Sequence, residues 1–176
     1  MSDLFLHGIQ NVTVDDGARP ITTVRSSTIG LIGSAPEADP LIFPLNKPVL
    51  IAGSRTLAAK LGETGTLPQA LDSIFDQIGA VVIVVRIDEE ETAPATLANV
   101  IGGVDANTGT YEGVHAFLAS ENITGFVPKI LIAPGFTHTR TEAVGETPAT
   151  SNPVVAELIG IAERLKAVIV ADGPNT

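Results

Sequence analysis

The chain has 176 residues, a formal net charge of −10 and no cysteine, and 44% of its residues are hydrophobic although only 4% are aromatic. This length fits one domain with appendages, whose core must be built from Ala, Val, Ile and Leu, as in packed α/β layers. The acidic balance argues against binding to nucleic acid or to an anionic membrane. The missing cysteine excludes disulfides, thiolate metal sites and a cysteine nucleophile.

The N-terminus shows no sign of a targeting segment. It has neither a basic region nor a long apolar run, so we do not expect a signal peptide. The most apolar run, residues 80–85, is far too short to cross a bilayer. We therefore expect a soluble protein that does not insert into membranes.

Residues 1–20 are predicted to form an extended arm ahead of an α/β domain at residues 21–176. The apolar side chains of the arm share one face only if a bulge lies near residues 10–11. A single strand is barely stable in water, so the arm must pair with a sheet, either as an edge strand of its own domain or in a neighbouring subunit. The residues expected to pair are Leu4, Phe5, Leu6, His7, Ile9, Val12 and Val14.

Short apolar strands alternate with amphipathic helices along the rest of the chain. Residues 80–85 are continuous Ala, Val and Ile without alternation, which is typical of a central strand covered on both faces. The pattern predicts a largely parallel central sheet flanked by helices. In chain order, we expect strands at residues 27–33, 48–53, 80–87, 129–133 and 167–171, and helices at residues 55–61, 67–78, 95–101, 115–122 and 153–165.

The connections carry recognisable start and stop signals. Ser54 is placed to cap the first helix, and Asn152 or Ser151 to cap the last one, which Pro153 opens. Residues 105–109 read as a turn, and residues 137–152 as a long loop rich in Thr, Gly and Pro. Because a packing helix usually follows a strand such as residues 167–171, we expect the chain to be the front part of a longer polypeptide.

Open α/β sheets bind ligands at the carboxyl ends of their strands, so the residues there are the first candidates for a functional site. No phosphate-binding Gly-rich loop and no G-x-S-x-G nucleophile elbow occurs. Ser34 follows a strand, but His7, His115 and His138 fall in the arm, a helix and a loop, in no order that suggests a triad. The sequence therefore predicts no catalytic residue.

Acidic residues give weak support for a metal site. The run Asp88, Glu89, Glu90 and Glu91 is consecutive, so neighbouring side chains diverge, and it reads as a solvated strand exit. The stretch from Asp105 to Gly109 lacks the distal Glu of a calcium loop and reads as an Asx turn. We expect no metal and no cofactor.

Several blocks of the sequence resemble one known family, the tail sheath proteins of contractile-tailed phages, in the P2-like branch that includes contractile bacteriocins. The resemblance spans almost the whole chain, and its weakest part is residues 137–152. The blocks are FLHGIQNVTVDDGARPITTVRSSTIGLIGSA, FPLNKPVLIAG, GTLPQALDSIFDQ, AVVIVVRIDE, GVHAFLASENITGFVPKILIAPGF and AVIVADGPNT.

The resemblance implies a structural role without enzymatic activity. Sheath subunits polymerise helically around an inner tube, and contraction drives the tube through the bacterial envelope. The resemblance implies that the arm adds a strand to a neighbouring copy, with a hinge at Gly17, Arg19 and Pro20. Implied partners are further copies, the inner tube protein, and baseplate and tail terminator proteins, in a virion tail assembled in the bacterial host cytoplasm.

One departure from the family stands out. Family members run well beyond 176 residues, and their later portion supplies the C-terminal arm, the partner sheet and most of the tube contact. We therefore expect a structural subunit, or the N-terminal portion of one. Two alternatives stay open: an α/β enzyme or small-ligand binder of Rossmann-like topology, and a monomeric adaptor that pairs its arm with one foreign protein.

Overall fold

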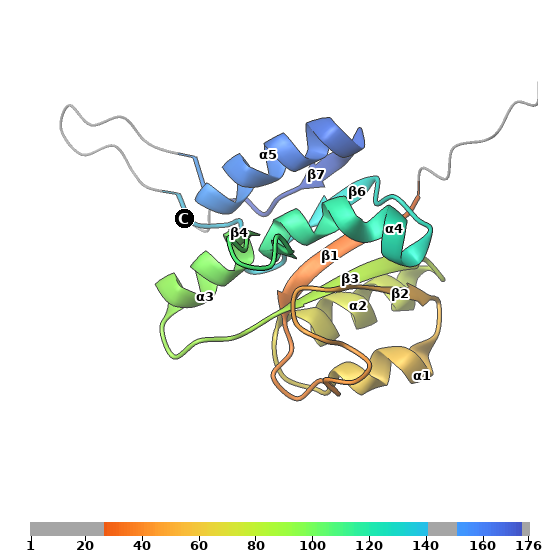
Figure 1. Ribbon diagram of the computed structural model, residues 1–176. Helices are drawn as coiled ribbons and strands as arrows, with labels where there is room; N and C mark the ends of the chain where they lie inside the picture. The colour runs from red at the N-terminus through yellow and green to blue at the C-terminus, as the bar shows by residue number, and fades with distance from the viewer. Residues whose placement is uncertain (1–26, 141–150, 174–176) are drawn as a thin grey trace, which may run out of the picture.

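The computed structural model describes residues 27–140 and 151–173, and a five-stranded sheet runs through the middle of this part (Figure 1). The strand order is β2-β3-β1-β6-β7, and every neighbouring pair is parallel except β2 with β3. The predicted α/β class with a largely parallel sheet is confirmed. The predicted arm, residues 1–20, lies outside the described residues. The strands are β1 (Ile29–Ser34), β2 (Pro48–Ala52), β3 (Val81–Ile87), β6 (Ile130–Ile132) and β7 (Val168–Val170).

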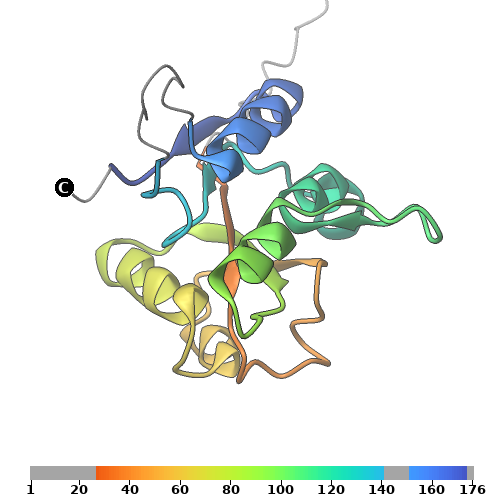
Figure 2. The ribbon, with the colours of Figure 1, turned by 90° about the vertical axis from the view of Figure 1, so that its left-hand side faces the viewer.

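Helices cover both faces of the sheet (Figures 1 and 2). One apolar cluster joins Leu31, Val82 and Val84 to α1 (Arg55–Ala58), η1 (Ala59–Leu61) and α2 (Thr66–Gln77). The other joins Ile32, Val85 and Ile87 to α3 (Ala93–Ile101), η2 (Gly113–Ala119) and α5 (Pro153–Leu165), with the short helix α4 (Ser120–Thr124) following η2. Alternate side chains of β1 and β3 thus enter opposite cores, as the pleat of a strand requires.

The valine-rich strand β3 is buried as its sequence predicted. Residues 82–85 are all fully buried, because α2 lies over one face of the strand and α3 and η2 over the other. Its two neighbours differ in direction, however: β1 is parallel to β3 and β2 is antiparallel. The connection between β1 and β2 contains no helix that could carry the chain back across the sheet, so β2 returns beside β3 in the opposite direction.

Helix α5 begins where its sequence indicated. Asn152, not Ser151, is the N-cap, and its side-chain Oδ1 accepts from the N–H groups of Val154 and Val155 at 2.9 and 3.2 Å. At the other end of the helix, Lys129 Nζ donates to the carbonyl of Leu165. A charged donor there is favourable because the last carbonyls of a helix have no partner within it.

Two local features differ from the sequence-based expectation. The segment predicted as a helix at residues 115–122 is a 3₁₀ helix, η2, followed by the single α-helical stretch α4. The predicted turn at residues 105–109 joins two short antiparallel strands, β4 (Gly103–Val104) and β5 (Tyr111–Glu112). Strands of two residues are too short to leave a periodic pattern, which explains why the sequence did not predict this hairpin. Within the described residues no helix is long and apolar enough to cross a membrane.

Candidate functional site

The carboxyl ends of β1, β3, β6 and β7 point to the same side of the molecule, toward the viewer in Figure 2. This is the edge of an open α/β sheet at which ligands normally bind. Two cavities lie along it, and both draw residues from the loops that follow the strands.

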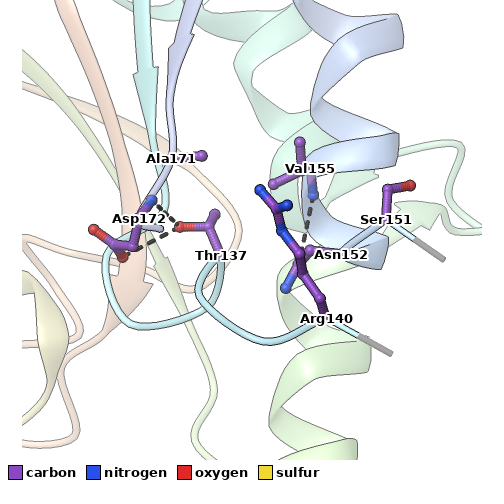
Figure 3. Close-up of a pocket in the computed structure, with 7 residues that line it drawn as sticks. All are labelled: Thr137, Arg140, Ser151, Asn152, Val155, Ala171 and Asp172. Atoms are coloured by element: carbon purple, nitrogen blue, oxygen red, sulfur yellow. Dashed lines mark hydrogen bonds between the residues drawn. The ribbon is translucent and has the colours of Figure 1, made fainter. Parts of the chain in front are cut away.

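The first cavity, of about 320 Å³, lies between the end of β7 and the start of α5 (Figure 3). Thr137 accepts a hydrogen bond from the Asp172 N–H at 2.9 Å and donates to its carboxylate Oδ2 at 3.2 Å. These bonds tie the loop after β6 to the end of β7. The first cavity is lined by Thr137, Arg140, Ser151, Asn152, Val155, Ala171 and Asp172.

Asn152 is the other polar anchor of this cavity, and its side chain is almost fully buried. Besides capping α5, its Nδ2 donates to the carbonyls of Phe136 and Thr139, both at 2.9 Å. The amide group therefore holds the loop after β6 against the start of the helix. The polar atoms of Asn152 and Thr137 bind the protein itself, so these two residues form a structural junction between the loop after β6, α5 and β7.

The second cavity, of about 620 Å³, brings together residues that are far apart in the sequence. Ser34, His138 and the acidic residues Glu89, Glu90 and Glu91 all line it. The Ser34 hydroxyl accepts from the Thr66 N–H at 3.4 Å, and the Thr66 hydroxyl accepts from the Ser34 N–H at 3.2 Å. Ser34 is buried and occupied by this reciprocal pair, and no hydrogen bond between Ser34 and His138 is present in the described part of the chain.

The acidic run has a local structural use. The Glu90 N–H donates to the Thr96 hydroxyl at 3.0 Å, and Asn99 Nδ2 donates to the Asp88 carbonyl at 3.2 Å. These bonds shape the turn from β3 into α3 and leave the carboxylates exposed to solvent. In residues 27–140 and 151–173, no group of three His, Asp or Glu side chains converges on a point where a metal ion could bind.

The loop at Asp105 forms the Asx turn that its sequence indicated. Asp105 Oδ1 accepts from the Asn107 N–H at 2.7 Å, and Oδ2 accepts from the Thr108 hydroxyl at 2.9 Å. These bonds stabilise the charged carboxylate, the Asn107 N–H most strongly, and lower the pKa of Asp105 below its ordinary value. The carboxylate thus serves the hairpin between β4 and β5.

The two histidines in the described residues, His115 and His138, have different surroundings. His115 Nε2 lies 2.9 Å from the carboxylate of Glu157, which links η2 to α5, whereas His138 lines the second cavity. His7 lies outside the described residues. So do all the other residues predicted for the arm and its hinge: Leu4, Phe5, Leu6, Ile9, Val12, Val14, Gly17, Arg19 and Pro20.

Comparison with known proteins identifies the family of this chain, which the two cavities do not reveal. Residues 26–87, which run from just before β1 to the end of β3, match the family model described as the N-terminal region of domain III of the tail sheath protein Gp18. The chain is 43% identical to the tail sheath protein of Escherichia phage P2 over 141 residues, or 77% of this chain. It belongs to the tail sheath protein family.

Two further sheath relatives align with nearly the whole chain. A Pseudomonas aeruginosa protein, whose name describes a prophage major tail sheath protein, is 35% identical over 173 residues, or 98% of the chain. The major tail sheath protein of Serratia phage KSP20 is 35% identical over 170 residues, or 95% of the chain. The chain spans only 35%, 41% and 40% of the phage P2, P. aeruginosa and KSP20 proteins, respectively.

Proposed function

We propose that this chain is a structural subunit, or part of one, of a contractile phage-like tail sheath. In this role it polymerises helically around an inner tube, and contraction of the sheath drives the tube through the bacterial envelope. The observation that carries the proposal is the similarity to three tail sheath proteins at 35–43% identity, two of them over 95% or more of the chain.

The structure agrees with a scaffold role. Two buried polar residues that line the cavities, Ser34 at the end of β1 and Asn152 at the start of α5, are hydrogen-bonded to the protein itself. An enzyme site needs groups aimed at a reacting atom, such as a nucleophile bound to a base. We therefore propose that the α/β domain acts as a rigid body and that function resides in its contacts with other molecules.

The arm is the contact that we propose as the permanent link between copies. Residues 4–14 contain no charged residue apart from the titratable His7. With a bulge near residues 10–11, their apolar side chains share one face of a strand. Main-chain hydrogen bonds to a neighbouring sheet would hold the copies together while body-to-body contacts change. Gly17, Arg19 and Pro20 are the hinge at which the arm leaves the body.

The acidic body suits interfaces that rearrange. Because the net charge is −10, we expect many carboxylates at the rims of the interfaces between copies. Polar contacts at a rim can be exchanged at a lower free-energy cost than contacts in an apolar interface. A contact that repeats without closing generates a helical tube. From the family, we propose that the chain's partners are other copies, the inner tube protein, and the baseplate and tail terminator proteins, and that the virion tail is assembled in the bacterial host cytoplasm.

Deletion of residues 1–19 from the full-length subunit tests the arm. We expect the deleted subunit to keep its circular dichroism spectrum and melting temperature but to form no striated tubes in electron microscopy. Tubes formed at the same yield and with the same striation as the intact subunit would contradict the arm's role.

The second cavity favours one alternative, an α/β domain that binds a small ligand. It opens at the carboxyl ends of β1, β3 and β6, where Rossmann-like sheets bind their ligands. Its three consecutive glutamates disfavour phosphate groups by charge repulsion. A ligand that binds the native state must raise the melting temperature, so a thermal screen of neutral and cationic metabolites tests this alternative.

A further inference from the structure

One half of one sheet face is left uncovered by the described helices. On the side of the sheet that carries α1, η1 and α2, the buried cluster reaches β2, β3 and β1. In Figure 2 these helices, in yellow, lie at the lower left, and within the described residues no helix lies on that side of β6 and β7. On the opposite side, α5 packs over both strands.

The strand register identifies the side chains on this face. Ile29 of β1 is aligned with Ile130 of β6, which is aligned with Val168 of β7. The next row on the same face is Leu31, Ile132 and Val170. We call Ile130, Ile132, Val168 and Val170 the bare sheet face; Ile132, at its border, also packs against the cluster that includes α2.

Exposure rises steadily across these rows. Leu31 is fully buried, Ile130 and Ile132 are half-buried, and Val168 and Val170 are 66% and 51% exposed. The intervening residues Leu131 and Ile169 point the other way and pack in the cluster that includes α5. All four members of the bare sheet face are β-branched and apolar, which is the composition of a strand covered on both sides.

We propose that the bare sheet face is the docking surface for an amphipathic helix that belongs to the same sheath polypeptide and lies outside these 176 residues. A helix fits because helices pack on the faces of sheets, and the uncovered surface is a sheet face. An added strand would pair with an edge of the sheet and would leave this face uncovered. On this side α2 already covers the neighbouring strands, so a second helix beside it completes the layer.

The length of the relatives points to the same polypeptide as the source. The chain spans 35–41% of the three sheath relatives, so more than half of each of those proteins is available to supply the helix. A face with no polar side chain is typical of a core within one subunit, since contacts between subunits mix apolar and polar groups. This inference depends on the family and is independent of the arm.

Cysteine labelling tests the proposal cleanly, because the chain has no cysteine of its own. Val168→Cys is introduced into the 176-residue chain. A cysteine is also introduced at the aligned position of the longer P. aeruginosa relative, which aligns with 98% of the chain. Any native cysteines of that relative are replaced first. Ile78→Cys is the matched control, because Ile78 is also 66% exposed but lies at the end of α2. The rate of reaction with a maleimide is measured for each monomer.

In the 176-residue chain, we expect Val168→Cys and Ile78→Cys to react at the same rate. In the longer monomer, we expect the cysteine at the position of Val168 to react at least about tenfold more slowly than the cysteine at the position of Ile78. Equal rates at the two positions in both the longer monomer and its assembled sheath would overturn the proposal. Protection that arises only on assembly would assign the face to a neighbouring copy. Protection already present in the 176-residue chain would assign it to the chain's own residues. Each of these last two results also overturns the proposal.

Discussion

Asn152 fastens the loop after β6 to the start of helix α5. Its oxygen accepts from two helix N–H groups and its nitrogen donates to the carbonyls of Phe136 and Thr139. The sequence predicted a cap at Asn152 or Ser151, because either residue ahead of Pro153 and an apolar repeat is a helix start signal. It could not predict the two carbonyl contacts, which depend on where the loop after β6 passes.

Replacing Asn152 should therefore cost more than an ordinary cap. We expect Asn152→Ala to lower the free energy of unfolding by about 2 kcal/mol, because a cap is lost and two carbonyls lose a donor. Ser151→Ala, at the neighbouring exposed residue, should change it by less than about 0.5 kcal/mol. Urea denaturation of both variants makes the measurement, and equal effects would contradict the structural role of Asn152.

Two glycines should respond to alanine with opposite signs. Gly113 has φ +57°, and a Cβ there would lie 2.4 Å from the Val100 carbonyl oxygen, while its N–H donates to Asn46 Oδ1 at 3.0 Å. We expect Gly113→Ala to destabilise the protein by at least about 2 kcal/mol. Gly160 lies within α5 with open space around it, so Gly160→Ala should stabilise the protein by about 0.5–1 kcal/mol. Thermal unfolding of the pair checks both signs.

The Asp105 carboxylate gives a prediction about pH. Its folded-state pKa is lowered, so its stabilising contribution is present at neutral pH and is lost as the pH falls through that lowered pKa, below the usual value of about 3.9. An NMR titration should show the Asp105 carboxyl and the Asn107 amide proton shifting together below that value. A midpoint at or above about 3.9 would mean that the turn does not hold the charge.

At the scale of elements, the connection between β1 and β2 depends on one arginine. Arg86 of β3 donates from Nε to the Phe43 carbonyl at 2.7 Å and from Nη1 to the Ala35 carbonyl at 3.4 Å. Both carbonyls lie in residues 35–47, which contain no regular helix or strand. The guanidinium therefore supplies donors that a helix or sheet would otherwise provide.

We expect Arg86→Met to loosen this connection without unfolding the sheet. Hydrogen exchange at the Ile42 and Phe43 amides, which donate to the Asp39 carbonyl, should speed up by at least about tenfold. Exchange in β3 at Val84 should change much less. Arg86→Lys is the control for charge, and because a single ammonium cannot replace the guanidinium fork, it should show most of the same effect. Unchanged exchange in both variants would rule out the proposed support.

The elements also show what the sequence could and could not supply. The strands at β1, β3 and β6 and the helices α2 and α5 were predicted from apolar patterns and caps, because burial and helix starts are local signals. The antiparallel direction of β2 depends on the route of a loop without regular structure. The 3₁₀ geometry of η2 and the hairpin of β4 and β5 depend on tertiary contacts such as that of Asn46 with Gly113. The shared cavity of Ser34 and His138 likewise follows from topology, which spacing along one chain does not reveal.

At the scale of the whole molecule, the α/β body and the arm are expected to have separable roles. The body has an apolar cluster on each face of its sheet, so it should fold with or without the arm. We propose that the arm pairs through its backbone, so replacing its side chains should matter less than removing its N–H donors. This distinction gives a sharper test than deletion alone.

We expect Leu6→Pro combined with Val12→Pro in the full-length subunit to block tube formation, because proline removes a ladder donor and fixes φ. Leu6→Thr with Val12→Thr is the matched control, since threonine keeps the N–H and favours strands, and these subunits should still assemble. Tube yield is counted by electron microscopy of subunits with equal melting temperatures. Equal yields for the two pairs would show that backbone pairing by the arm is dispensable.

The most direct measurement is a cryo-electron microscopy reconstruction of the sheath assembled from the full-length subunit. Tracing residues 4–14 from residue 27 settles which molecule they pair with. Our account predicts that they cross to an adjacent copy and add a strand to its sheet. A trace that folds back to pair with the sheet of its own domain would contradict it.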